Sequence, residues 1–224
     1  MSTETRRRRR LAAILAADVV GYSRLVGADE ERTLQRLRVL YREVLQPTVV
    51  QHGGRVFKLN GDSVLVESPS AVEAVHCAVA MQRALISAET DTPPDRRISL
   101  RIGVHVGDVV AEGGDLLGDG VNVAARLEGL AEPHGVVLSA AAHEAVGHRV
   151  AGDVLDLGER RLKNIERPIR AFALRAEAPG PAAAPAIGPA LAADPAAAPS
   201  ISLPDRPSLA VLPFRQALPD GGEA

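Results

Sequence analysis

The stretch Val56–Val66 places the strongest constraint on local folding in this sequence of 224 residues. Two short apolar runs flank Asn60-Gly61, and this dipeptide between alternating apolar residues is a strong short-range signal for a β-hairpin. Asp62 leaves the turn beside a glycine, where its carboxylate can point into a cleft, and Lys58 lies just before the turn. A plain surface hairpin with solvated charges fits these residues equally well, so partners elsewhere in the chain must decide.

Composition limits the classes of protein that this chain can belong to. With 46% apolar residues, the chain can bury one core and the start of a second, so we expect one full domain with appendages. The 26 basic and 28 acidic residues give a net charge of −2, which provides no general attraction to nucleic acids or membranes. The single cysteine, Cys77, excludes an intramolecular disulfide and suits the reducing cytoplasm; we expect it to be a small core residue.

The N-terminal segment resembles a secretory signal, because Arg6–Arg10 precede the apolar run Leu11–Ala17. Asp18 ends that run after seven residues, and no later stretch approaches the roughly 18 apolar residues of a membrane span. We therefore expect no membrane span, and we expect residues 1–10 to form a basic arm. The arm is either solvated or contacts an anionic surface.

The apolar run also predicts a buried first strand, although alanine and leucine leave a helix possible by propensity. Asp18 would lie at the exit of this strand, beside the glycine-containing turn at Gly21. If the first strand neighbours the hairpin, Asp18 would approach Asp62. Two aspartates brought together repel each other, so their natural use is to hold a divalent metal through hard oxygen ligands.

Periodicity predicts most of the other elements. Helical spacing follows Asp29 as far as Gln46, where Pro47 must kink or interrupt the helix, and Ser70 can cap a second helix. Residues 98–106 alternate as a strand whose second face includes His105, which we expect to be a hydrogen-bonded surface histidine and not a catalyst. Further expected elements are a second strand at 109–111, a helix at 118–131, a strand at 135–138, a short helix at 141–146 and a strand at 169–174.

The segment after Asp115 is the second informative stretch. Gly118 and Gly120 open the expected helix, which places Asn122 and Arg126 one turn apart on the same face. An amide and a guanidinium at this spacing can bind a ribose and a phosphate. An ordinary exposed helix face fits this segment as well when it is taken alone.

Four motifs, taken in order, resemble those of class III nucleotidyl cyclase catalytic domains over residues 11 to about 175. They are Asp18–Ser23, Lys58–Asp62, Asp115–Gly118 leading through Asn122 to Arg126, and Leu162–Asn164. Each motif is weak alone, whereas the ordered set is specific. The resemblance implies an α+β fold with a ferredoxin-like βαββαβ core and an antiparallel-rich sheet flanked by helices.

The resemblance also assigns roles to individual residues. Asp18 and Asp62 would hold two ions, Mg²⁺ or Mn²⁺, that activate the ribose 3′-hydroxyl and neutralise the triphosphate. Lys58 and Asp115 would bind adenine, because an ammonium donates to a ring nitrogen and a carboxylate accepts from the exocyclic amine. The implied reaction is that of an adenylate cyclase, which converts ATP to 3′,5′-cyclic AMP and pyrophosphate.

The remaining implied residues serve the ribose and the phosphates. Asn122 would orient the ribose, while Arg126 and Lys163 would stabilise the charge on the phosphates as pyrophosphate leaves. In the family, one protomer of a head-to-tail dimer supplies the metal ligands and the other supplies the remaining residues. This chain carries both sets, so the expected partners are ATP and a second copy of the chain, without a specific nucleic acid.

Other functions compete with this one. The alternative from another class is a non-catalytic cyclase-like module that binds nucleotide or a partner; such modules usually lose a metal aspartate or the arginine, and here all seven positions are filled. Guanylate cyclase activity is opposed by Lys58 with Asp115. Diguanylate cyclase activity is opposed because Gly113-Gly114-Asp115 is not followed by an acidic-aromatic pair.

Composition divides the chain into four expected parts. Residues 1–10 form the basic arm, and residues 11–175 form the cyclase-like domain. Residues 176–206 are rich in alanine and proline and form a linker. Residues 207–224 would be the start of a truncated second domain.

Overall fold

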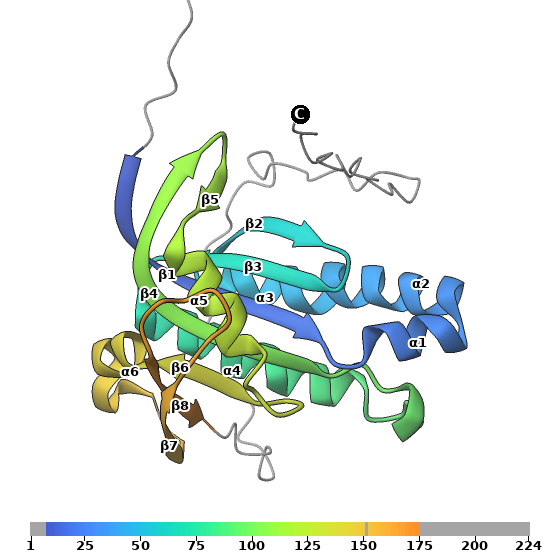
Figure 1. The fold of residues 1–224 in the computed structure, drawn as a ribbon. Helices are drawn as coiled ribbons and strands as arrows, with labels where there is room; N and C mark the ends of the chain where they lie inside the picture. The colour runs from blue at the N-terminus through green and yellow to red at the C-terminus, as the bar shows by residue number, and fades with distance from the viewer. Residues whose placement is uncertain (1–7, 151, 175–224) are drawn as a thin grey trace, which may run out of the picture. The chain divides into compact units, whose positions relative to one another are not determined.

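The computed structural model describes residues 8–150 and 152–174, which form an eight-stranded, mostly antiparallel sheet flanked by helices (Figure 1). This architecture confirms the expected α+β class. The expected linker at 176–206 and the expected second domain at 207–224 lie outside the described residues.

Four strands form the first half of the sheet, in the order β2-β3-β1-β4, and every neighbouring pair among them is antiparallel. They are β1 (Arg8–Val19), β2 (Arg55–Asn60), β3 (Ser63–Ser68) and β4 (Leu100–Glu112). With the helices between them, these strands give the ferredoxin-like βαββαβ order.

The second half of the sheet continues from β4 in the order β6-β8-β7, and β6 runs parallel to β4. These strands are β6 (Val136–Ser139), β7 (Val154–Arg160) and β8 (Ile169–Leu174), while β5 (Asp115–Leu117) folds back onto the end of β4. The strand β7 was not predicted, because its residues are mostly exposed and it has a register shift between Asp156 and Gly158.

The helices are α1 (Tyr22–Ala28), α2 (Glu30–Leu40), α3 (Gln46–Gln51), α4 (Ala71–Ala88), α5 (Asp119–Glu128) and α6 (Ala140–Val146). Short 3₁₀ turns occur at Pro94–Arg96 and Gly147–Arg149. Sequence periodicity missed α1, which has one buried residue, Leu25, and therefore shows no apolar stripe.

The helix caps and the proline behave as the sequence predicts. Asp29 accepts a hydrogen bond from the Arg32 backbone, and Ser70 accepts one from the Glu73 backbone, so these side chains begin α2 and α4. A π-helical segment, Tyr41–Leu45, separates α2 from α3 immediately before Pro47. The proline therefore interrupts the regular α-helix without ending the helical segment.

Two strands are longer than the sequence suggested. We expected the first strand to begin at residue 11 and expected a break at Gly107 and Asp108, but β1 and β4 pair continuously from Arg8 with Ala111 to Val19 with Leu100. The break is absent because the backbones of residues 107 and 108 find ladder partners on β1. Part of the expected basic arm therefore lies in the sheet, where Arg10 forms an ion pair with Glu67.

The hairpin is confirmed, but its two-residue loop is Gly61-Asp62, because Asn60 pairs with Ser63. Gly61 has a φ of 62°, a conformation that glycine adopts without steric cost, and Asp62 does not share it. A positive φ at the first loop position alone is typical of a type II′ turn. The aspartate is thus part of the turn itself.

The two faces of the sheet have different covers. Figure 1 shows α5 crossing one face, over β1 and β4, while α2, α3 and α4 lie on the other face. The close approach of α5 depends on Gly103, because a Cβ there would stand 2.3 Å from the carbonyl oxygen of Ala124 and the backbone nitrogen of Glu128. The face of α5 that contacts the sheet includes Val123 and Leu127, which are fully buried.

His105 lies on the face covered by α5 and is buried, so its expected position at the surface is wrong. Its Nδ1 is 2.8 Å from the Ser139 hydroxyl, which confirms the expected hydrogen bonding. Burial lowers the pKa of His105 to about 4, although the charge of Asp119 acts in the opposite direction. Cys77 is fully buried as expected, and burial raises the pKa of its thiol to about 12.

Candidate active site

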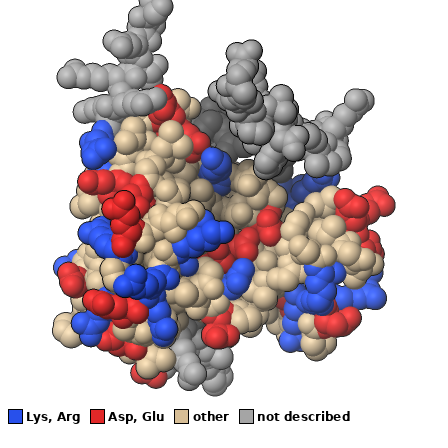
Figure 2. Space-filling model, viewed as in Figure 1, with Lys and Arg blue, Asp and Glu red and all other residues tan. Residues whose placement is uncertain are grey.

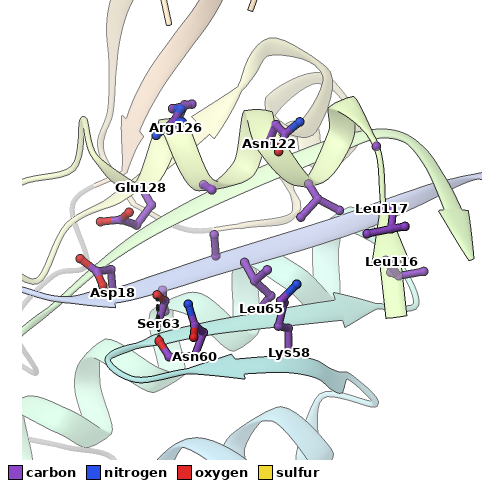
Figure 3. A pocket seen from close by; sticks show the side chains of 15 residues that line it. Asp18, Lys58, Asn60, Ser63, Leu65, Leu116, Leu117, Asn122, Arg126 and Glu128 are labelled. Carbon is purple, nitrogen blue, oxygen red and sulfur yellow. Dashed lines mark hydrogen bonds between the residues drawn. The ribbon is translucent and has the colours of Figure 1, made fainter. Parts of the chain in front are cut away.

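A pocket of about 470 Å³ lies between α5, the end of β1 and the β2–β3 hairpin. Figure 3 shows Asp18 and Glu128 facing each other at one end of the pocket, with Lys58, Leu116 and Leu117 toward the other end. The wall also includes Asn60 and Ser63 from the hairpin and Asn122 and Arg126 from α5. Of the residues singled out in the sequence, Asp18, Lys58, Asn122 and Arg126 line this pocket, and Asp115 pairs with Lys58.

Asp18 and Asp62 come together, as their positions in the sequence suggest. Pairing of β1 with β3 places the exit of β1 beside the hairpin turn that contains Asp62. Burial raises the pKa of Asp62, and the charge of Asp18 and a hydrogen bond between the two carboxyl groups raise it further. The backbone hydrogen bond and Arg101 act in the opposite direction. These two groups therefore share a partly buried site in which both cannot easily be charged without a cation.

Arg101 and Glu128 complete the charge cluster, and sequence analysis did not assign either to the site. Arg101 lies opposite Asp18 in the β1–β4 ladder, and its Nη2 is 3.0 Å from Asp18 Oδ2. Its Nε is 3.0 Å from Glu128 Oε1. Burial raises the pKa of Glu128 to about 7, Asp18 and Asp62 contribute in the same direction, and Arg101 opposes them.

At the other end of the pocket, Lys58 and Asp115 form an ion pair, with Lys58 Nζ 3.5 Å from Asp115 Oδ2. Arg55 supports this arrangement because it bonds both to Glu67 on β3 and to the Gly114 carbonyl, next to Asp115. The side chains of Lys58 and Asp115 are 49% and 37% exposed. The pair is open to water and to any ligand that enters the pocket.

Asn122 and Arg126 lie one turn apart on α5, as predicted, and both are exposed while lining the pocket. Their neighbours on the opposite face of the helix, Val123, Ala124 and Leu127, are buried against the sheet. The amphipathic helix thus anchors itself through its apolar face and presents an amide and a guanidinium to solvent.

Lys163 stands apart from the other predicted residues. It is exposed on the loop between β7 and β8 and does not line the pocket. Leu162 is buried in the second core, and Asn164 has a φ of 64°, which asparagine tolerates better than most residues. The motif Leu162–Asn164 therefore anchors a turn that projects the lysine outward.

The carboxylate pair suits a hard divalent cation. Two aspartates held close together supply oxygen ligands, and a cation would remove the repulsion that raises the pKa of Asp62. Within residues 8–150 and 152–174, no group of three or more histidine, cysteine, aspartate or glutamate side chains is arranged to hold a metal. The protein donors here are thus a pair, and further oxygens would come from a bound ligand or water.

The face of the molecule seen in Figure 2 gives little support for binding to a polyanion. In Figure 2, acidic and basic side chains alternate over the visible face. Among the described residues, we find no helix that combines the length and the apolar character needed to cross a bilayer.

Comparison with known families gives one match that spans most of the chain. The family model described as "Adenylate and Guanylate cyclase catalytic domain" matches residues 6–174. The matched range contains all seven residues singled out from the sequence.

Similar proteins carry related names. A protein from Rhizobium meliloti (strain 1021) named "Putative adenylate cyclase 3" is 51% identical over 211 residues, covering 92% of this chain and 34% of that protein. An "Adenylate cyclase" from Streptomyces coelicolor is 34% identical over 132 residues, covering 59% of this chain and 33% of that protein. The chain thus spans about a third of the length of these relatives.

A solved structure supports the fold. The "Adenylate/Guanylate Cyclase/Hydrolase" from Silicibacter pomeroyi has a TM-score of 0.72 and 43% identity, with 78% of this chain and all of that chain covered. The sheet and helices described above therefore follow an architecture that has been observed experimentally.

Proposed function

This chain belongs to the adenylate and guanylate cyclase catalytic domain family, and on that basis we propose that it is an adenylate cyclase. The proposed reaction converts ATP to 3′,5′-cyclic AMP and pyrophosphate through attack of the ribose 3′-hydroxyl on the α-phosphate. The observation that carries the proposal is that one pocket of the chain has the carboxylate of Asp18 at one end and the ammonium of Lys58 at the other, the two half-sites that a dimer would combine between its copies. The adenylate cyclase names of two relatives agree with it.

The carboxylates of Asp18 and Asp62 are the proposed ligands of two Mg²⁺ or Mn²⁺ ions. When bound, such ions lower the pKa of the attacking hydroxyl and neutralise the triphosphate. The proximity of the two aspartates supports this assignment, since the repulsion between them favours a cation. Among the described residues, the pocket contains no histidine, so we assign no separate protein base.

The opposite end of the pocket is the proposed adenine site. Lys58 can donate to a ring nitrogen of the base, and ionised Asp115 can accept from its exocyclic amine. Their ion pair at 3.5 Å holds the two groups at the same edge of the pocket before a base enters. The apolar side chains of Leu116 and Leu117 line the pocket beside them.

Asn122 is proposed to orient the ribose, and Arg126 and Lys163 are proposed to stabilise the charge on the phosphates. The exposure of all three side chains supports a role toward a ligand or a second protein copy. The reaction is assigned to the cytoplasm, where the buried free thiol of Cys77 would persist.

We further propose that the site is shared in a head-to-tail homodimer. One protomer would supply Asp18 and Asp62, while its partner would supply the base, ribose and phosphate residues. The exposed position of Lys163, outside the pocket of its own chain, supports this division. Because the chain carries both sets, a symmetric dimer has two equivalent sites.

The test is incubation of the purified protein with ATP or GTP and Mn²⁺, with the product identified by mass. Formation of cyclic AMP with release of pyrophosphate supports the proposal. Cyclic GMP as the main product contradicts the substrate assignment, and the absence of any cyclic nucleotide from a folded dimer contradicts the enzymatic assignment.

A further inference from the structure

Arg101 is held by two carboxylates from two different elements of the fold. Its Nη2 is 3.0 Å from Asp18 Oδ2 on β1, and its Nε is 3.0 Å from Glu128 Oε1 at the end of α5. The side chains of Asp18, Arg101 and Glu128 are 21%, 31% and 13% exposed. Arg101 therefore donates a hydrogen bond to Asp18 and lies within ion-pair distance of Glu128, so one guanidinium contacts two partly buried acids.

The position of Glu128 is fixed by the contact between α5 and the sheet. Gly103 lies two residues after Arg101 on β4, and a Cβ there would stand 3.0 Å from the Glu128 Cα. Leu127, the preceding residue, is fully buried in the second core. The backbone that carries Glu128 thus has little freedom to move away from Arg101.

We propose that Glu128 is a positioning residue: it gives the Arg101 guanidinium a second carboxylate, so that Asp18 can exchange its contact with Arg101 for a divalent cation while Arg101 stays paired. This inference rests on the proposed role of Asp18 as a metal ligand. Without Glu128, Asp18 is the one carboxylate that remains of these two ion pairs of Arg101. The guanidinium and the cation then compete for Asp18. Because a partly buried charge without a partner is costly, Asp18 then stays paired with Arg101 and binds the cation more weakly.

A simpler effect of Glu128 would also change metal binding. As a third carboxylate near Asp18 and Asp62, it adds negative potential that attracts a cation regardless of Arg101. The two explanations differ in one respect: the positioning role requires Arg101, whereas the direct attraction does not. A double-mutant cycle between positions 128 and 101 separates them.

The experiment measures the dissociation constant of Mn²⁺ for the full chain at pH 8, by the electron paramagnetic resonance signal of the free ion. The variants are Glu128→Gln, Arg101→Met and the double variant, with Glu132→Gln as a control that removes an exposed carboxylate four residues further along the chain. We expect Glu128→Gln to raise the dissociation constant about threefold or more in the wild-type background and less than about twofold in Arg101→Met. The metal concentration at half-maximal turnover should shift in parallel, with a smaller change in kcat.

An equal shift in the two backgrounds would assign Glu128 to direct attraction and overturn the inference, and so would the absence of a shift in both. If Arg101→Met does not fold, Arg101→Gln replaces it, because glutamine also lacks the charge that competes with the cation for Asp18; the expected shrinkage of the Glu128 effect is the same. Asp18→Ala in the same titration tests the metal assignment itself. Unchanged Mn²⁺ affinity in Asp18→Ala would overturn both proposals. If Asp18→Ala loses affinity but Glu128→Gln has an equal effect in both backgrounds, only the positioning role of Glu128 is overturned.

Discussion

The charged side chains at the two ends of the pocket differ in their exposure and in how closely they are paired. At the end formed by Asp18, Arg101 and Glu128, each charged side chain is at most about a third exposed and forms an ion pair with another of the three. At the other end, Lys58 and Asp115 are more exposed and meet at 3.5 Å. The first end owes its order to the β1–β4 ladder and to α5, whereas the second is built on a hairpin and a short strand at the edge of the fold.

This difference indicates which properties each end contributes. A buried and mutually paired cluster is preorganised, so changing one member disturbs the others and the effect is large. An exposed ion pair contributes little to stability, and its partners remain free to bind a ligand. We therefore expect substitutions of the proposed metal ligands at the acidic end to abolish the reaction, and substitutions at the other end to alter the choice of substrate.

The largest expected effect is the loss of turnover in Asp18→Ala and in Asp62→Ala. Each variant should lower kcat by roughly 10³-fold or more, because a two-ion site that loses one carboxylate holds the ions and the triphosphate poorly. Circular dichroism and size-exclusion chromatography should show an unchanged fold and assembly. Asp153→Ala, at an exposed position, serves as the control, and near-wild-type turnover of either site variant at saturating Mn²⁺ would contradict the metal assignment.

The second prediction concerns the division of the site between protomers. Mixing inactive Asp62→Ala with inactive Arg126→Ala should restore about a quarter of wild-type turnover, because half of the randomly formed dimers are mixed and each holds one intact site. Turnover of each variant and of the mixture is measured after subunit exchange has been demonstrated by fluorescence energy transfer. A mixture as inactive as its parents, despite exchange, argues against half-sites shared across the dimer.

Much of the fold was predictable because its signals are local. The Asn60-Gly61 hairpin, the caps at Asp29 and Ser70 and the interruption at Pro47 depend on neighbouring residues, and all four are found. The lengths of β1 and β4 were not predictable, because the ends of these strands are fixed by their pairing with each other. The strand β7 is mostly exposed, and its apolar residues Val154, Leu155 and Leu157 do not all fall on one face.

The site shows the same division between local and non-local information. The spacing of Asn122 and Arg126 is a property of one helix, and their shared face followed from the sequence. The bridge from Asp18 through Arg101 to Glu128 joins three elements, and the sequence offered only the polar face of β4 as a hint. A partly buried charged residue opposite a candidate ligand, such as Arg101 opposite Asp18, cannot be identified until the strand register is known.

The third prediction tests the exposed end. Wild-type protein should favour ATP over GTP by about tenfold to a hundredfold in kcat/KM, because guanine reverses the donor and acceptor pattern that Lys58 and Asp115 match. Lys58→Glu combined with Asp115→Ser should erode this preference while leaving Mn²⁺ affinity within about twofold, since neither residue is a proposed metal ligand and Asp18, Arg101 and Glu128 lie on β1, β4 and α5. Equal specificity constants of the wild type for ATP and GTP would remove the adenine-reading roles from both residues.

The smallest expected effect lies at His105, which belongs to neither end of the pocket and is more deeply buried than the acidic cluster. Burial lowers its pKa to about 4, against an ordinary value of 6.5, and Arg167 acts in the same direction while Asp119 opposes it. His105 therefore binds a proton near pH 6.5 in the unfolded chain but only near pH 4 in the folded chain. By linkage, stability from this residue is complete above pH 6.5 and declines as the pH falls from there toward 4.

Between pH 7 and pH 5, this residue should cost the wild type roughly 1–2 kcal/mol of unfolding free energy. In His105→Asn, which keeps a polar group near Ser139, the loss over the same interval should shrink by that amount, even if the variant is less stable at pH 7. Urea unfolding at a series of pH values measures the slope. His134, whose pKa burial also lowers, remains in both proteins, so part of the slope persists in the variant. Identical slopes in the wild type and the variant would show that His105 takes up its proton equally well in the folded protein, and that burial beneath α5 does not exclude its charge.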